Sequence, residues 1–364
     1  MVSYFSSSFH CYELIYSVVK NALLLTRLLV AVCLLMIVLS SVGVTMAGRQ
    51  NSPDRNAEKL GLKFVADISL PGGSSRFDYQ SIDEAHRRLY ISHMGANLVT
   101  VFDLRSRAVV GNISSVPSPT GILAVPELNV VYVSAPGRNE VYVIDENSLK
   151  AIHKIRTGSF PDGIAYDPEL KRVFVSCEFG GTVTVFDALS DRVITNIRMS
   201  GHVGNTHFDP VSKMIYSTVQ TRGELVEIDP KTLHVVARYQ LPGCKGPHGF
   251  YIDSHTHYAF ITGEDNATYV VFDLSSKRII SRGKVGEGPD VLAFDKSPHR
   301  LYVASESGVV SVFDIEKGAV RKVGESFFAK NAHTVSVDQK THLVFFPLQN
   351  VDGRPVLRVM KPIK

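Results

Sequence analysis

Tryptophan and cysteine are the residues that this sequence lacks or uses least. Its 364 residues contain no tryptophan and four cysteines, of which Cys11 and Cys33 lie before residue 48. No Cys-x-x-Cys pair, haem-attachment sequence or zinc-ribbon spacing occurs, so cysteine gives no support to these cofactor and metal classes. The other two, Cys177 and Cys244, could form a disulfide in an exported protein, but two separate small apolar side chains are the favoured interpretation.

An excess of charge of one sign is also missing. The 39 Lys and Arg residues are nearly balanced by 35 Asp and Glu residues, which leaves a net charge of +4. Clusters of basic residues, and stripes in which basic and aromatic residues alternate, mark proteins that bind nucleic acids, and neither occurs here. We therefore expect no nucleic-acid partner.

What the sequence does have is a unit that recurs seven times. Residues 160–201 show it best, with four short runs of alternating or β-branched residues separated by Asp-Pro, Gly-Gly and Asp-Ala-Leu-Ser-Asp. Such runs predict antiparallel strands joined by hairpins. One residue after the first run marks each copy, at spacings of 42, 42, 42, 44, 42 and 43 residues: Asp83, Val125, Asp167, Asp209, Asp253, Asp295 and Asp338.

A second Asp closes the third run of six copies, 20 residues after the first marker in five of them and 19 in the sixth: Asp103, Asp145, Asp187, Asp229, Asp273 and Asp314. We expect these recurring Asp side chains to hydrogen-bond their own turns. Seven copies of four strands predict an all-β fold, a seven-bladed β-propeller of four-stranded blades over residues 62–364. Residues 62–70 form a predicted strand without a partner in its own unit, and the seventh copy lacks a fourth strand. Ring closure by this N-terminal strand would leave no open sheet edge.

Several segments of the repeat resemble a known family. Three of these segments look like the YVTN repeat of the YncE-like bacterial β-propellers: Val131-Tyr132-Val133-Ser134, Val141-Tyr142-Val143-Ile144-Asp145 and residues 300–304. The resemblance covers about residues 62–364. It implies the seven-bladed fold and leaves the function open, because similar propellers serve as binding proteins and as enzymes.

The N-terminal region has the pattern of a targeting segment. Leu28 to Ala47 contains no charged residue and follows the basic residues Lys20 and Arg27. This hydrophobic leader predicts a signal peptide over residues 1–47. At roughly 20 residues, its apolar run is also long enough for an uncleaved membrane anchor. Both alternatives predict an exported protein, periplasmic or extracellular, and the second would tether it to the inner membrane. Residues 48–61 are predicted to be a linker.

Candidate functional residues stand out where the seven copies differ. Five residues before the first marker, where the first strand of each blade begins, the copies carry Asp78, Thr120, Asp162, Gly204, His248, Asp290 and His333. First strands line the axis of a propeller, so these side chains should meet at one solvated mouth of the central channel. We predict a ligand or metal site there, formed by Asp78, Asp162, His248, Asp290 and His333. Their carboxylate neighbours should raise the pKa of both histidines.

A second layer of polar residues is expected around this site. The hairpin after the second strand of each blade should open on the same face, and eleven residues after the first marker it carries Met94, Pro136, Glu178, Gln220, Glu264, Glu306 and Gln349. From these hairpins and the neighbouring strands we select five candidates for the second layer: His93, Glu178, His207, Glu264 and Glu306.

Several chemistries fit these residue types. Asp and His together suit zinc or another divalent transition metal, whereas calcium would prefer Asp78, Asp162 and Asp290 alone. A His248–Asp290 pair could act as a general base with its orienting group. The same side chains could instead cap loop N–H groups. No cofactor motif occurs, so a divalent metal ion is the one cofactor that the residues suggest.

Three functions remain open. The favoured one is an exported or membrane-tethered binding module that holds a small ligand or a protein partner on the loop face, because nothing in the sequence identifies a nucleophile. A metal-assisted enzyme, similar to the seven-bladed lactonases and the streptogramin lyases, would use the Asp and His residues of the mouth. A structural surface scaffold would leave these residues merely solvated.

Overall fold

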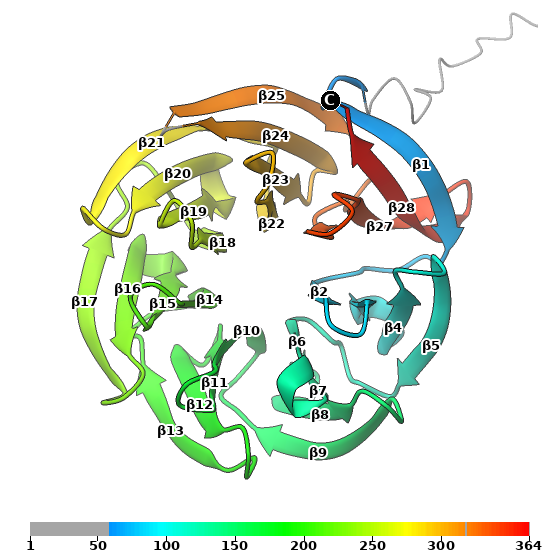
Figure 1. Ribbon diagram of the computed structural model, residues 1–364. Helices are drawn as coiled ribbons and strands as arrows, with labels where there is room; N and C mark the ends of the chain where they lie inside the picture. The colour runs from blue at the N-terminus through cyan, green and yellow to red at the C-terminus, as the bar shows by residue number, and fades with distance from the viewer. Residues whose placement is uncertain (1–57, 317–318, 364) are drawn as a thin grey trace, which may run out of the picture. The chain divides into compact units, whose positions relative to one another are not determined.

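The computed structural model describes residues 58–316 and 319–363, which form seven four-stranded antiparallel sheets around one axis (Figure 1). This confirms the predicted all-β propeller of seven blades. The predicted leader and most of the predicted linker lie outside the described residues. Within the described part, no helix combines the length and the hydrophobicity needed to span a membrane.

Six blades are each built from four consecutive strands, which run from the axis outwards. Their strands are β2 (Gln80–Asp83), β3 (Arg88–His93), β4 (Leu98–Asp103) and β5 (Ala108–Ser114); β6 (Ile122–Val125), β7 (Val130–Ala135), β8 (Glu140–Asp145) and β9 (Lys150–Arg156); β10 (Pro161–Asp167), β11 (Arg172–Cys177), β12 (Thr182–Asp187) and β13 (Val193–Arg198); β14 (Val203–Asp209), β15 (Met214–Val219), β16 (Glu224–Asp229) and β17 (His234–Gln240); β18 (Pro247–Asp253), β19 (Tyr258–Gly263), β20 (Thr268–Asp273) and β21 (Arg278–Lys284); β22 (Pro289–Asp295), β23 (Arg300–Ser305), β24 (Val309–Glu316) and β25 (Ala319–Phe327). Short 3-10 helices lie in four of the connections: η1 (Met94–Ala96), η2 (Pro126–Leu128), η3 (Gln220–Arg222) and η4 (Glu264–Asn266).

The seventh sheet combines strands from both ends of the described chain. Its strands, from the axis outwards, are β26 (Ser336–Val337), β27 (Val344–Val351), β28 (Arg354–Pro362) and β1 (Leu62–Ser69). β1 pairs with β28 in an antiparallel register that runs from Leu62 opposite Pro362 to Ser69 opposite Val356. In Figure 1 these two strands, blue and red, lie side by side at the outer edge of their sheet.

An aromatic residue recurs in the second strand of every blade and fills the space between blades. These side chains are between 0% and 1% exposed: Tyr90, Tyr132, Phe174, Tyr216, Phe260, Tyr302 and Phe345. Tyr90, for example, packs in one cluster with Val131 and Val133 of the next blade. Burial of such a side chain stabilises a fold by roughly 1.5–3 kcal/mol. The repeat thus places its largest apolar side chains where neighbouring blades meet.

The recurring Asp residues mostly serve their own turns, as the sequence predicts. Asp83 Oδ1, for example, accepts hydrogen bonds from the backbone N–H groups of Ala85 and His86 at 2.8 and 2.9 Å. Asp314 differs, because its carboxylate forms ion pairs with Arg300 and Arg321. Both described cysteines, Cys177 and Cys244, are buried and free, which agrees with the favoured interpretation of two separate thiols.

Candidate functional site

Close contact between neighbouring inner strands brings the predicted site residues to the axis. A Cβ atom on Gly121 would lie 1.9 Å from the backbone oxygen of Asp162, and one on Gly249 would lie 2.0 Å from that of Asp290. Glycine is therefore required at both positions, because any side chain would push the adjacent blade away. The approach fixes Asp162 at the start of β10 and Asp290 at the start of β22.

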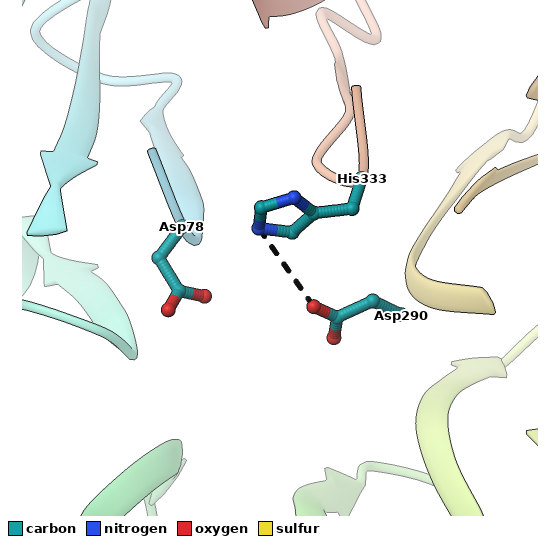
Figure 2. Close-up of side chains that lie close together, drawn as sticks. All are labelled: Asp78, Asp290 and His333. Atoms are coloured by element: carbon teal, nitrogen blue, oxygen red, sulfur yellow. Dashed lines mark ion pairs between the residues drawn. The ribbon is translucent and has the colours of Figure 1, made fainter. Parts of the chain in front are cut away.

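The structure brings together all five residues that the sequence singled out. His248 Nε2 lies 3.3 Å from Asp290 Oδ1 and 3.7 Å from Asp162 Oδ2. His333 Nε2 lies 3.9 Å from Asp290 Oδ2, and Figure 2 shows the imidazole of His333 directed between the carboxylates of Asp78 and Asp290. One ligand atom from each of these last three residues lies within 4.8 Å of the other two. We call the five residues the Asp/His cluster: Asp78, Asp162, His248, Asp290 and His333.

The prediction of a solvated mouth is wrong. Members of the Asp/His cluster are only 0% to 8% exposed. One cause is Arg76, whose Nη1 donates a hydrogen bond to Glu306 Oε1 at 2.6 Å while Nη2 lies 3.8 Å from Asp290 Oδ2. Another is Gln220, whose Nε2 lies 2.6 Å from His248 Nδ1. These longer side chains from the surrounding loops cover the cluster.

Tyr79 joins the cluster, although it is not among the site residues predicted from the repeat. Its hydroxyl accepts a hydrogen bond from Asn205 Nδ2 at 2.6 Å and donates one to Asp290 Oδ1 at 3.3 Å. A signal was present in the repeat, because three other copies carry glycine at the position of Tyr79. Arg76 was also missed, and it precedes the repeat positions that we compared.

Burial and mutual interaction shift the pKa values of the cluster strongly. Burial raises the pKa of Asp162 to about 7 although the charge of His248 opposes the shift. Burial and the charges of Asp162 and Asp290 also raise the pKa of Asp78 well above its usual value. Burial alone would raise the pKa of Asp290, but its hydrogen bond to His248 and the charge of that residue lower it to about 2. The same contact outweighs the effect of burial on His248 and raises its pKa to about 10.

His333 behaves differently from His248, so the prediction of a raised pKa is wrong for this residue. Burial lowers the pKa of His333, and this effect outweighs the attraction of Asp290. Its Nδ1 lies 3.0 Å from the backbone oxygen of Asn331, which can only accept a hydrogen bond, so Nδ1 carries the proton. Nε2 then has a free lone pair, and it has no hydrogen-bond partner among the described residues. His333 is therefore a neutral, fully buried imidazole with its lone pair directed at two carboxylates.

Carboxylates outnumber cations around the cluster. The three Asp residues of the cluster and the second-layer residues Glu178, Glu264 and Glu306 face two cationic groups, Arg76 and His248. Burial raises the pKa of Glu264 as well, and Asp290, Glu306 and Glu178 add to the shift. The raised pKa values show that full ionisation is unfavourable, so the site would gain from a further cation.

The second-layer candidates divide into two groups. Glu178 Oε1 accepts a hydrogen bond from Gln220 Nε2 at 3.3 Å, Glu306 binds Arg76, and Glu264 interacts electrostatically with His248. These three thus surround the cluster. His93 instead stacks on Phe77 and contacts Ser75 and Pro71. His207 packs against the rings of Phe250 and Tyr251.

A cavity of about 1100 Å³ lies along the inner strands. Tyr79, Asn205 and Asp290 form part of its wall, together with largely apolar residues such as Phe208 and Tyr251. Glu84 and His86, which follow β2, line it as well. One residue of the Asp/His cluster, Asp290, therefore lines a cavity that is large enough for a small organic molecule.

Comparison with known proteins supports the fold alone. No protein-family model matches the sequence, and no curated protein matches it. Among solved structures, the chain is similar to hydrazine synthase of Kuenenia stuttgartiensis, with a TM-score of 0.67 and 18% sequence identity over 80% of this chain and 97% of that chain. At this identity the match supports the β-propeller and says nothing of activity. The resemblance to the YncE-like family stays a prediction.

Proposed function

We propose that this protein is a binding module that holds a divalent transition metal ion, and through it a small ligand, at Asp78, Asp290 and His333. The observation that carries the proposal is the state of His333. A fully buried imidazole nitrogen without a hydrogen-bond partner is costly unless something binds to it. Two carboxylates stand within reach of that nitrogen.

The local structure around His333 supports a role as a metal ligand. Histidine binds a metal as the neutral imidazole, and its other ring nitrogen usually donates to a backbone carbonyl or a carboxylate. His333 has both properties, since its pKa is lowered and its Nδ1 is bound to Asn331. A bound cation would also offset the excess of carboxylates. The nitrogen ligand favours zinc, manganese or cobalt over calcium, which prefers oxygen.

Isothermal titration calorimetry with zinc, manganese and calcium tests this proposal. We expect the wild-type protein to bind zinc, and His333→Ala to bind one equivalent less while its thermal unfolding in the absence of metal still shows a folded protein. His234→Ala removes an exposed histidine from an outer strand and is the matched control, with unchanged stoichiometry. Equal zinc stoichiometry in wild type and His333→Ala would refute the proposal, as would a wild-type protein that binds no metal.

A metal-assisted enzyme is the second candidate. Three protein ligands leave one coordination position open, which is the arrangement of catalytic rather than structural zinc sites. Asp290, one of the three, also lines the large cavity. Hydrolysis of a lactone by the metal-loaded wild type, lost in His333→Ala, would favour this candidate. Metal binding without turnover of any lactone or lyase substrate would favour the binding module, on whose loop face a protein partner could also dock.

Two further proposals concern the N-terminal part of the chain. The uncharged run of Leu28 to Ala47 supports export, either with cleavage near Gly48 or with retention as a membrane anchor. N-terminal sequencing of the exported protein distinguishes the two, because an anchor would keep Lys20 and Arg27. The pairing of β1 with β28 supports the proposal that the N-terminal strand closes the ring.

A further inference from the structure

The repeat itself reveals a second unusual site, at the other ends of the inner strands. The position after the third-strand Asp is apolar or small in five copies: Leu104, Ala188, Pro230, Leu274 and Ile315. The second blade carries Glu146 there, and this side chain is only 2% exposed. A buried carboxylate at a position that other blades fill with apolar residues calls for a specific partner.

A second residue that departs from the repeat lies next to Glu146 in the structure. Three residues after the first marker, the other six copies carry Leu128, Leu170, Ser212, Thr256, Pro298 and Thr341, whereas the first blade carries His86. His86 Nδ1 lies 2.7 Å from Asp83 Oδ2 and 3.2 Å from Glu146 Oε2. Two exceptional residues from adjacent blades thus converge on Asp83, which is a regular member of the repeat. We call Asp83, His86 and Glu146 the Glu146 cluster.

Histidine beside the marker Asp is not unusual by itself. His257 Nε2 of the next blade lies 2.7 Å from Asp209 Oδ2, and His342 Nδ1 lies 2.9 Å from Asp295 Oδ1. Such a pair can simply join two blades. What distinguishes the Glu146 cluster is the additional carboxylate on the same histidine nitrogen.

Glu146 Oε2 has no hydrogen-bond partner in the described part of the chain, because His86 Nδ1 approaches it at 3.2 Å without hydrogen-bond geometry. The other carboxylate oxygen of Glu146 accepts a hydrogen bond from Tyr90 at 3.3 Å. Arg88 also approaches Glu146, but it donates to the backbone oxygen of Glu146 rather than to the carboxylate. Burial and the charge of Asp83 raise the pKa of Glu146 to about 7. The unpartnered oxygen therefore faces Asp83 and His86, and among the described residues no lysine or arginine forms an ion pair with the Glu146 carboxylate.

We propose that Asp83, His86 and Glu146 form a second divalent metal site, of the zinc class, between the first two blades. Bonds of about 2.0–2.2 Å in a tetrahedral zinc site place neighbouring ligand atoms roughly 3.3 Å apart, so the observed spacings need only small adjustments. The three ligand atoms lie within 4.8 Å of one another.

The exposed side chain of His86 makes the Glu146 cluster accessible from solvent. Its side chain is 44% exposed, and it lines the cavity described above. A metal ion can therefore enter from solvent, and the fourth coordination position lies towards water or a ligand at the cavity rim. Two oxygen ligands and one nitrogen ligand suit zinc, cobalt or manganese, whereas calcium would favour oxygen ligands alone.

The matched variants come from the repeat. Glu146→Leu introduces the residue that two other blades carry at this position, so the fold should tolerate it. His86→Ala changes a half-exposed residue and removes the nitrogen ligand. Glu169→Gln is the control, because it neutralises an exposed carboxylate in the turn of another blade. Native mass spectrometry with zinc alone counts the bound ions, and thermal unfolding with and without zinc measures their effect on stability.

We expect Glu146→Leu and His86→Ala each to bind one zinc ion fewer than the wild type and Glu169→Gln. Glu146→Leu should also melt at the same temperature as metal-free wild type or above it, because it no longer buries a carboxylate. If His86 is only a protonated bridge between two carboxylates, all four proteins will bind equal numbers of zinc ions, and the proposal is overturned. His333→Ala keeps this site, so loss of zinc at one cluster is separable from loss at the other.

Discussion

Removal of β1 should be the most damaging truncation of this fold. A protein that starts at Pro71 loses Leu60 and Leu62, which are both 0% exposed, and burial of one such side chain is worth roughly 1.5–3 kcal/mol. It also loses Asp67, whose carboxylate binds the guanidinium of Arg358 at 2.9 and 2.7 Å. Arg358 is 5% exposed, and removal of one partner from a buried ion pair costs about 3–5 kcal/mol.

These losses are comparable with the whole free energy of unfolding of a typical domain, about 5–15 kcal/mol. They come in addition to the backbone groups of β28 that would lose their partners in β1. We therefore expect the truncated protein to aggregate or to unfold at a much lower urea concentration, as followed by circular dichroism and size-exclusion chromatography. A protein that starts at Glu58 retains β1 and is the control. A monomeric truncated protein with the urea midpoint of this control would refute the idea that β1 closes the ring.

Two further predictions concern ionisable groups inside the fold. Arg87→Met should lower the free energy of unfolding by about 3–5 kcal/mol, as measured by urea titration. The reason is that Asp338 is 1% exposed and would keep its charge without the guanidinium that lies 2.7 Å away. The double variant Arg87→Met with Asp338→Asn should recover most of this loss. Burial lowers the pKa of His207 to about 4, against about 6.5 unfolded, so the folded state binds fewer protons between these values and stability is lost as the pH falls from about 6.5 towards 4. This loss amounts to at most about 3 kcal/mol, and equal pH profiles of wild type and His207→Gln would contradict it.

The repeat predicts the ring and the meeting of the Asp/His cluster, because hairpins of constant length hold equivalent residues at equivalent places. The positions of Asp290 and His333 in the site are therefore predicted by the spacing of the repeat alone. The burial of the cluster is not predicted by this spacing, since it depends on long side chains such as Arg76 that reach across from other loops. The pKa of His333 could not be predicted either, because it depends mainly on the burial of the ring and also on the carbonyl of Asn331. Arg76 lies outside the pattern that identified the site, whereas Gln220 occupies a repeated hairpin position whose contact with His248 the pattern does not predict.

Departures from the repeat indicate functional residues as well as the regular positions do. Tyr79 stands where three other copies have glycine, and Glu146 stands where five other copies have apolar or small residues. Both changes are visible in the sequence, but only the structure shows which other residues they meet. His93 illustrates the opposite case. It lies next to the repeated hairpin position in sequence, yet its ring stacks on Phe77 with centroids 3.9 Å apart and takes no part in the cluster.

An anomalous difference map from zinc-soaked crystals, measured on both sides of the zinc absorption edge, tests the central proposal most directly. The account predicts a peak in the Asp/His cluster, about 2.0–2.2 Å from His333 Nε2 and from an oxygen of Asp78 and of Asp290. Crystals of His333→Ala should lack this peak and keep any peak at Glu146. A wild-type map without zinc density beside His333 would contradict the proposal, whatever it shows elsewhere.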